Sequence, residues 1–245
     1  MKYKVPYTVT DSLSSWCPGC GHGIVARLVC EAAEELGISE KLIVVTDVAC
    51  GSLLVGVLTF NNIGAAHGRP IITAAGAKRA RKDAVVLAHI GDGAAYSIGI
   101  ESTIHAALRN ENIVALVVNN GVFGMTGGQM SPATLPGQKT TSSPAGRDVE
   151  YNGAPFDIVK TIGQYDIAYL ARGSVDSPAE VTKAGKMIKK AFEYQLNNKG
   201  FSLVEILSPC PTNWGLSPRD SMRRVKEEQK VFYPVGEFVD RGGSK

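Results

Sequence analysis

The chain has 245 residues, of which 44% are hydrophobic, and this is enough to bury the core of one large α/β domain. Its formal net charge of +3 comes from scattered residues and argues against a nucleic-acid-binding protein. No apolar run reaches the roughly 18 residues that span a bilayer, and residues 1–10 contain no stretch of the signal-peptide type. We therefore expect a soluble cytoplasmic protein that acts on neither nucleic acid nor membrane.

Strand-like and helix-like segments alternate along the chain. Three amphipathic stretches predict helices, at 23–36, about 95–109 and 178–196. Four short apolar runs rich in β-branched residues predict buried strands, at 42–46, 84–90, 113–118 and 202–207. Gly37 is expected to end the first helix, and Ser177 to cap the last. This alternation predicts an α/β fold with a mostly parallel sheet and helices on both faces, in which ligands bind beyond the carboxyl ends of the strands.

Two segments do not follow this alternation. Residues 121–155 are rich in Gly, Pro, Ser and Thr and are expected to form a long loop, which is often functional. Residues 211–245 are polar and lack a strong core pattern. We therefore expect a main domain over residues 1–210 and a C-terminal arm over 211–245 that packs on a partner subunit. The mixed charges of 219–230 within that arm indicate a solvated or subunit-facing helix.

The strand at 84–90 continues directly into Gly91, Asp92, Gly93 and Ala94, where a helix begins. The glycines allow a sharp turn close to a ligand, and the helix N-terminus offers free N–H groups to an anion. Asp92 is placed to hold a hard cation such as Mg²⁺. Asn120, just after the next strand, can supply a second oxygen, and a backbone carbonyl beyond it a third. The alternative is a tight turn with structural glycines, but two such motifs after two strands favour a metal-held diphosphate.

Four of the five cysteines are expected at the same edge of the sheet. Cys17 and Cys20 share a tight turn before the first helix, while Cys50 and Cys210 each follow a predicted strand. Four thiolates in one place can carry a [4Fe–4S] cluster. A Cys₄ zinc site and unligated buried thiols are the alternatives. For Cys30, on the apolar side of a helix, a buried thiol is the preferred interpretation.

These motifs resemble those of a known family. The spacing of G-D-G and N-N looks like the thiamine-diphosphate motif, and nearly the whole chain resembles the β subunit of the 2-oxoacid:ferredoxin oxidoreductases, of the branched-chain 2-oxoacid or 2-oxoglutarate type. The segments that carry this resemblance are W-C-P-G-C-G-H-G, A-C-G-S, A-A-H-G-R, G-D-G, N-N-x-x-x-G-M-T-G-G-Q, L-P-G-Q and S-P-C-P-T-N-W-G. Many relatives have an acidic residue where this chain has Ala94, which is not a required metal ligand.

The resemblance implies a set of cofactor residues. It implies a [4Fe–4S] cluster held by Cys17, Cys20, Cys50 and Cys210. It implies Mg²⁺ held by Asp92, Asn120 and the carbonyl of Val122. The residues expected to contact thiamine diphosphate are Cys50, Gly51, Ser52, His67, Gly91, Asp92, Gly93, Ala94, Asn120, Val122, Gly124, Met125 and Thr126.

The resemblance also implies partners. The glutamate that activates the cofactor is expected from an α subunit, so that this chain is inactive alone, and γ and ferredoxin-like δ subunits are possible additions. In this chain His67 and Arg69 are candidates for a catalytic role, and His22 for a supporting role at the cluster.

The function expected on this basis is CoA-dependent oxidative decarboxylation of a 2-oxoacid, with electrons passed through the cluster to ferredoxin. The uncharged Gly127 and Gly128 slightly favour 2-oxoisovalerate over 2-oxoglutarate as the substrate. Two alternatives stay open. One is the half of a non-redox thiamine-diphosphate decarboxylase or carboligase, and the other is a zinc-stabilised assembly subunit without catalysis.

Overall fold

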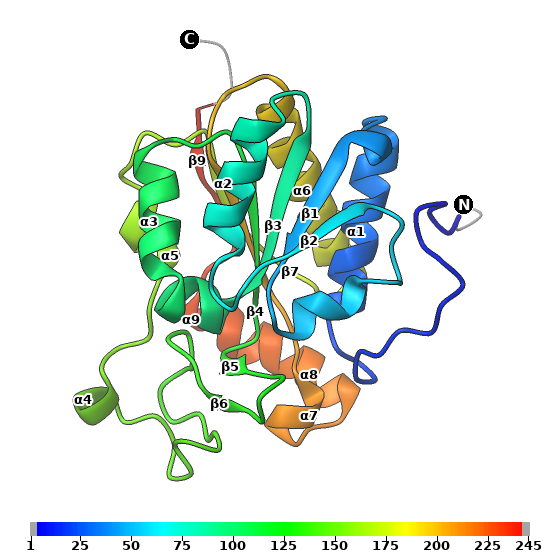
Figure 1. The fold of residues 1–245 in the computed structure, drawn as a ribbon. Helices are drawn as coiled ribbons and strands as arrows, with labels where there is room; N and C mark the ends of the chain where they lie inside the picture. Colours follow the sequence, from blue (N-terminus) through cyan, green and yellow to red (C-terminus); the bar gives the residue numbers. More distant parts are fainter. Residues whose placement is uncertain (1–3, 242–245) are drawn as a thin grey trace.

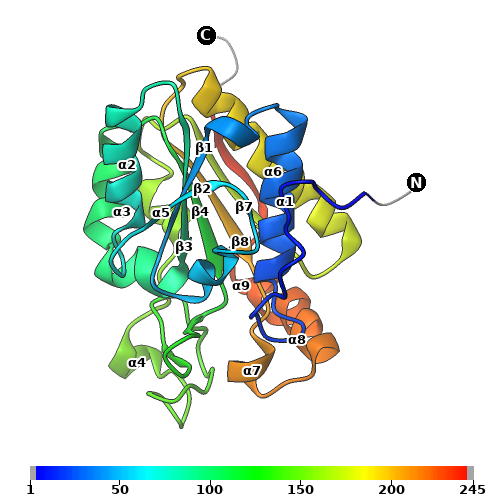
Figure 2. The same ribbon diagram turned by 45° about the vertical axis from the view of Figure 1, so that its right-hand side comes forward.

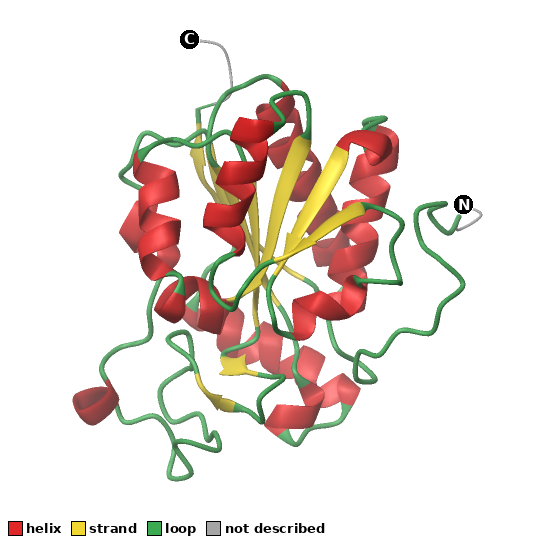
Figure 3. Cartoon of the chain, viewed as in Figure 1, coloured by secondary structure: helices red, strands yellow, loops and turns green. Residues whose placement is uncertain are grey.

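The computed structural model describes residues 4–241, which form a seven-stranded mixed sheet with helices on both faces and a separate two-stranded hairpin (Figure 3). The strands of the main sheet are β1 (Leu42–Thr46), β2 (Asn61–Gly64), β3 (Val85–Gly91), β4 (Val114–Asn119), β7 (Tyr169–Ser174), β8 (Ser202–Leu207) and β9 (Gly236–Asp240). Their order across the sheet is β2-β1-β3-β4-β8-β7-β9. Neighbouring strands are parallel except for β9, which runs antiparallel to β7.

Helices flank this sheet in two layers. The longer ones are α1 (His22–Glu35), α2 (Pro70–Ala80), α3 (Ile100–Leu108) and α6 (Pro178–Leu196). The short ones are η1 (Ser39–Lys41), η2 (Cys50–Leu54), η3 (Ala94–Ile98), α4 (Val149–Asn152), α5 (Ile158–Ile162), α7 (Pro211–Trp214), α8 (Pro218–Arg224), η4 (Val225–Gln229) and α9 (Lys230–Phe232). Helices α1 and α6 cover one face, and α2, α3 and α5 the other (Figures 1 and 2). No helix within residues 4–241 is both long enough and apolar enough to cross a bilayer.

Strand β3 shows why this sheet must be covered on both sides. Val86, Ala88 and Ile90 belong to the core under α2 and α3, whereas Val85 and Leu87 belong to the core under α1 and α6. Successive side chains of a strand point to opposite faces, so a continuous apolar run buries residues in both directions. Each fully buried aliphatic side chain stabilises the fold by about 1.5–3 kcal/mol.

The predicted elements are confirmed, with small shifts at some ends. Two strands and the helix at 178–196 have the predicted bounds, and the other two strands begin and end one residue later. Ser177 caps α6 by accepting a hydrogen bond from the Glu180 N–H, and Gly37 follows α1 with a φ of 64°. The helix predicted at 95–109 is interrupted: it begins as the π-turn η3, and α3 starts after Gly99. The strands β2, β7 and β9 and the helix α2 were not predicted.

The C-terminal segment 211–241 folds back onto its own domain. β9 adds to the edge of the main sheet beside β7. Val225 and Tyr233 are buried in the core of the α2–α3 face, and the Tyr233 hydroxyl donates to the carbonyls of Ala133 (3.2 Å) and Phe156 (3.0 Å). The part of the predicted arm within the described residues is therefore integrated into the sheet, while residues 242–245 lie outside them. A contact between its outer face and a partner subunit stays a prediction.

Candidate functional site

The carboxyl ends of four neighbouring parallel strands meet at one edge of the sheet. Asp47 follows β1, Asp92 follows β3, and Asn120 follows β4. Cys210 lies three residues beyond β8, which pairs with β4. In Figure 1 this edge is the lower one, where α7 and the small hairpin of β5 (Val122–Phe123) and β6 (Gln129–Met130) also lie. The topology thus brings together residues that are far apart in the sequence.

A cleft at this edge contains most of the residues predicted for the cofactor. Those that line it are Cys50, Gly51, His67, Gly91, Asp92, Gly93, Ala94, Asn120, Val122 and Gly124. Three predicted residues are not part of its wall. The Ser52 hydroxyl turns back to the Ala49 carbonyl (2.8 Å), the Thr126 hydroxyl donates to the Gln129 side chain (2.6 Å), and Met125 is exposed.

Asp92 is buried and fixed at the bottom of this cleft. One carboxyl oxygen accepts the Asn120 N–H (3.2 Å), and the other accepts the Ser131 hydroxyl. Burial raises the pKa of the Asp92 carboxyl to about 7, although the Ser131 hydroxyl lowers it. A carboxylate whose charged form is disfavoured by burial gains from a nearby cation. With the side-chain oxygen of Asn120, this donor set fits a hard cation such as Mg²⁺.

A buried ionic network supports the turn that carries Asn120. The Asn119 side chain donates to Glu205 on β8 (2.8 Å), as does the Tyr96 hydroxyl (2.8 Å). The other Glu205 oxygen accepts from the Arg172 guanidinium, which also pairs with Asp157 (2.6 Å). Paired and hydrogen-bonded charges can remain buried, and removing one partner is strongly destabilising. The buried network therefore fixes the backbone at the end of β4, where Asn119 and Asn120 lie.

Backbone positions around the cleft leave little room for side chains. A Cβ atom at Gly93 would lie 2.5 Å from the Phe123 ring. A Cβ at Gly51 would lie 2.5 Å from the His89 ring. Such contacts are too short for real atoms, so glycine is required here for close packing. The second glycine of the predicted G-D-G turn is therefore required because Phe123 of β5 packs directly against it.

The four predicted ligand cysteines gather beside this cleft. Burial raises the pKa of the Cys20 thiol to about 12 and that of Cys50 to about 11, and it also raises the pKa of Cys210. Charge repulsion adds to burial for every pairing of these cysteines, including those with Cys17. A direct contact joins two of the cysteine loops, because the indole N–H of Trp16, next to Cys17, donates to the Cys50 carbonyl (2.8 Å). Cys30 is buried in α1 and takes no part in these pairings.

No group of three or more His, Cys, Asp or Glu side chains between residues 4 and 241 is arranged to hold a single metal ion.

Polar groups of the protein point at the cysteine sulfur atoms. The Asn213 amide donates to the Cys210 sulfur (3.3 Å) and to the Gly124 carbonyl (3.0 Å). His22 Nδ1 lies 3.3 Å from the Cys20 sulfur. N–H groups near sulfur stabilise thiolates and influence the potential of a cluster that they ligate. Asn213 therefore connects the cysteines to the loop that carries the predicted diphosphate residues.

His67 and Arg69 differ in their environments. His67 lines the cleft, and its Nδ1 lies 3.3 Å from Asp47 and 3.2 Å from the Val48 carbonyl. Arg69 forms an ion pair with Glu101 on the half-exposed surface and does not line the cleft. Of the two candidates, only His67 is placed to meet a ligand there.

Sequence reasoning missed three residues at this site: Asp47, Ser131 and Asn213. Asp47 follows the strand LIVVT directly, so the reasoning applied to Asp92 after β3 could have found it. Asn213 lies within the motif S-P-C-P-T-N-W-G, but no feature of the sequence shows that its amide reaches Cys210. Ser131 comes from the long loop, whose path over the cleft could not be predicted.

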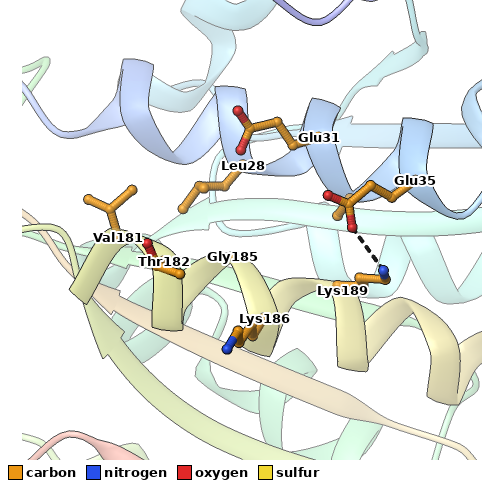
Figure 4. A pocket seen from close by; sticks show the side chains of 9 residues that line it. Leu28, Glu31, Glu35, Val181, Thr182, Gly185, Lys186 and Lys189 are labelled. Atoms are coloured by element: carbon orange, nitrogen blue, oxygen red, sulfur yellow. Dashed lines mark hydrogen bonds and ion pairs between the residues drawn. The ribbon is translucent and has the colours of Figure 1, made fainter. Parts of the chain in front are cut away.

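A second depression lies between α1 and α6, on the helical face of the domain. Figure 4 shows Leu28 and Val181 on its walls and the ion pair of Glu35 with Lys189 (2.8 Å) at one end. None of the residues predicted for the cofactors lines it. The strand-end cleft is thus the depression that unites the predicted residues.

Comparisons with known proteins identify the family to which the chain belongs. Residues 55–206 match the family of the thiamine pyrophosphate enzyme C-terminal TPP binding domain. The chain is 41% identical over 227 residues to ketoisovalerate oxidoreductase subunit VorA of Methanothermobacter thermautotrophicus, covering 92% of this chain and 48% of that protein. It is 36% identical to 2-oxoglutarate synthase subunit KorB of Archaeoglobus fulgidus, covering 90% of this chain and 79% of that one. The chain thus spans about half the length of the ketoisovalerate relative.

A solved structure has the same fold. It is the 2-oxoglutarate:ferredoxin oxidoreductase from Magnetococcus marinus with 2-oxoglutarate, coenzyme A and succinyl-CoA bound, at 25% identity and a TM-score of 0.80. The match covers 98% of this chain and 85% of that chain. The resemblance and fold expected from the motifs are confirmed. The chain therefore belongs to the family of 2-oxoacid:ferredoxin oxidoreductase subunits, and its central part is a TPP binding domain of the thiamine pyrophosphate enzymes.

Proposed function

We propose that this chain is the β subunit of a 2-oxoacid:ferredoxin oxidoreductase that binds thiamine diphosphate, Mg²⁺ and a [4Fe–4S] cluster. In the reaction the bond between the keto carbon and the carboxylate breaks, and a thioester to coenzyme A forms. One CO₂, one proton and two electrons are released for each 2-oxoacid and coenzyme A consumed. The thiamine supplies the nucleophilic carbon when it is bound, and the electrons leave singly for ferredoxin.

One observation carries this proposal: Asp92, Asn120 and Cys50 line the same cleft. Asp92 and Asn120 would hold Mg²⁺ with the Val122 carbonyl, and Gly91 and Gly93 would let the diphosphate approach the backbone. Cys50 would ligate the cluster together with the other three cysteines. Because Cys50 lines the same cleft as Asp92 and Asn120, an electron would travel only a short distance from the thiamine cofactor to the cluster.

The partner and the substrate are also part of the proposal. Because the similar proteins are named as subunits of oxidoreductases, we infer that an α subunit supplies the rest of the active site, including the activating glutamate. The presence of γ and ferredoxin-like δ subunits is tested by the subunit composition of the purified complex. The preferred substrate is 2-oxoisovalerate, in line with the name of the 41% identical relative, and 2-oxoglutarate is the second choice.

The test is anaerobic purification of the native complex. We expect a brown protein with iron and bound thiamine, whose visible absorbance is bleached by 2-oxoisovalerate plus coenzyme A. Thiamine without iron would instead indicate a non-redox decarboxylase or carboligase. Zinc without thiamine would indicate an assembly subunit and would refute the proposal. Turnover against a panel of 2-oxoacids then decides the substrate.

A further inference from the structure

A second buried carboxylate lies on the wall of the cleft, and neither the diphosphate site nor the cluster site uses it. Asp47 is 1% exposed, and it follows β1 just as Asp92 follows β3. One of its oxygens accepts the N–H groups of Val48 (3.0 Å) and Gly68 (3.0 Å). Its other oxygen is buried and has no hydrogen-bond partner. A buried carboxylate that is only half satisfied destabilises a fold, so its presence in a cleft indicates a functional role.

The neighbour of this carboxylate is His67. His67 Nδ1 lies between two acceptors, the Asp47 carboxylate (3.3 Å) and the Val48 carbonyl (3.2 Å), so this nitrogen carries a proton. The other ring nitrogen, Nε2, is then the one free to interact with a ligand. The ring is 31% exposed and lines the cleft together with Asp92 and Asn120. It also packs on Phe123, with ring centroids 6.1 Å apart.

The charge of Asp47 acts on the ring. Burial raises the pKa of the Asp47 carboxyl, while the Gly68 N–H and the charge of His67 lower it. With Nδ1 directed at Asp47 and the Val48 carbonyl, an imidazole that carries a proton on each nitrogen can donate from Nε2 into the cleft while its charge faces the Asp47 carboxylate. A donor at Nε2 fits a carbonyl oxygen that gains negative charge, as the keto oxygen of a 2-oxoacid does whenever a nucleophile adds to its keto carbon.

We propose that Asp47 and His67 form a dyad in which Asp47 is a positioning residue and His67 Nε2 donates a hydrogen bond to the keto oxygen of the bound 2-oxoacid. This inference rests on the proposed function, because it needs a 2-oxoacid in the cleft. It adds to that function a substrate contact supplied by this chain and not by the α subunit. Because the hydrogen bond strengthens as charge develops on the oxygen, the dyad affects kcat more than KM.

The test compares four variants of the intact complex with the wild type: Asp47→Asn, His67→Gln, the double variant and His105→Gln. Asn at position 47 keeps the size of the side chain and an oxygen for the two backbone N–H groups, and it removes only the charge. His105 is an exposed histidine of α3 outside the cleft and is the matched control. The measurements are kcat and KM for 2-oxoisovalerate, the affinity for thiamine diphosphate with Mg²⁺ by calorimetry, and the thermal midpoint.

We expect Asp47→Asn and His67→Gln each to lower kcat by about 10- to 100-fold, the range found for residues that orient a functional histidine or ligand. KM and thiamine-diphosphate affinity should change less than about threefold, and His105→Gln should behave as the wild type. The double variant should be no slower than His67→Gln alone, because Asp47 acts through the ring. Should Asp47→Asn not fold, His67→Gln decides alone, since its half-exposed side chain is not part of the core.

Three results would overturn the dyad. They are a His67→Gln complex as active as the His105→Gln complex, a double variant whose loss is the product of the two single losses, and a loss of cofactor affinity as large as the loss of kcat. A wild-type complex that lacks thiamine, or that turns over no 2-oxoacid, would refute the proposed function itself and is therefore distinguishable from these results.

Discussion

The two halves of the proposed site differ in how firmly contacts within the chain hold their groups before a ligand binds. On the diphosphate side, formed by Asp92, Asn120 and Ser131, hydrogen bonds within the chain already fix each group. On the thiol side, formed by the four predicted ligand cysteines, burial and mutual repulsion raise the pKa values of Cys20, Cys50 and Cys210 and so disfavour their thiolates. Both sides would gain charge compensation from a bound cation, but each group of the first is already held in place by hydrogen bonds within the chain. The two sides should therefore respond independently to mutation.

The largest effect is expected on the thiol side. Cys50→Ser replaces a thiolate ligand by a poorly ionised hydroxyl, so most of the cluster iron should be lost from the purified complex. The affinity for thiamine diphosphate should change less than about threefold, because the diphosphate side is fixed independently. The ratio of iron to protein, together with calorimetry, measures both. Cys30→Ala, at a buried cysteine of α1, is the control, and the complex with this variant should have the iron content of the wild type. Full iron in the Cys50 variant would remove this residue from the ligand set.

The next effect concerns the network below Asn119. Glu205→Gln removes the buried charge that faces the Arg172 guanidinium and should destabilise the domain by about 3–5 kcal/mol. Glu237→Gln, at a half-exposed ion pair with Lys190, should cost less than about 1 kcal/mol. Thermal unfolding of the two complexes in parallel measures the difference. Equal midpoints would mean that the buried network does not support the diphosphate side.

Asp92→Ala tests the diphosphate side directly. It removes the carboxylate proposed for Mg²⁺, and we expect the affinity for thiamine diphosphate to fall by about 100-fold, which corresponds to roughly 2.7 kcal/mol. The iron content should stay at the wild-type level. Calorimetry with thiamine diphosphate and Mg²⁺ measures this change in affinity. If the variant bound both at normal affinity, the assignment of this side would be wrong.

A smaller effect should appear as a pH dependence. The pKa of Asp92 is raised to about 7 in the folded chain, so its protonated form contributes stability at low pH that is lost as the pH rises through about 7. Mg²⁺ requires the ionised form, so its affinity should weaken by up to about tenfold for each pH unit below 7. Calorimetry between pH 6 and 8 measures this slope. Asp92→Asn, which cannot ionise, should show a flat profile at its own lower affinity.

The sequence was sufficient for the central strands because their apolar runs are continuous. β7 escaped prediction because Arg172 interrupts its pattern, and this charge is tolerated inside the sheet only through Glu205 and Asp157, which come from other elements. β2 escaped because its four residues are exposed at the sheet edge. No local pattern reveals either circumstance, since both depend on which strands become neighbours.

The site could be predicted to a similar extent. Asp92 and Asn120 follow predictable strands, and the cysteines lie in recognisable motifs, so their common edge follows from parallel topology. The outcomes for Arg69 and Met125 depend on side-chain direction, and the sequence does not contain this information. Asp47 was within reach, because its place at the end of β1 is equivalent to that of Asp92 at the end of β3.

The order of strands has a consequence for biosynthesis. β8 is inserted between β4 and β7, although it is made after both, and Cys210 follows it while Cys17 and Cys20 precede α1. The cysteines from the two ends of the chain can meet only after a loop of nearly 200 residues has closed, which is slow compared with local folding. A nascent chain on the ribosome thus has no complete set of sulfur ligands to offer. The proposed cluster can therefore be completed only after β8 has been synthesised and inserted between β4 and β7.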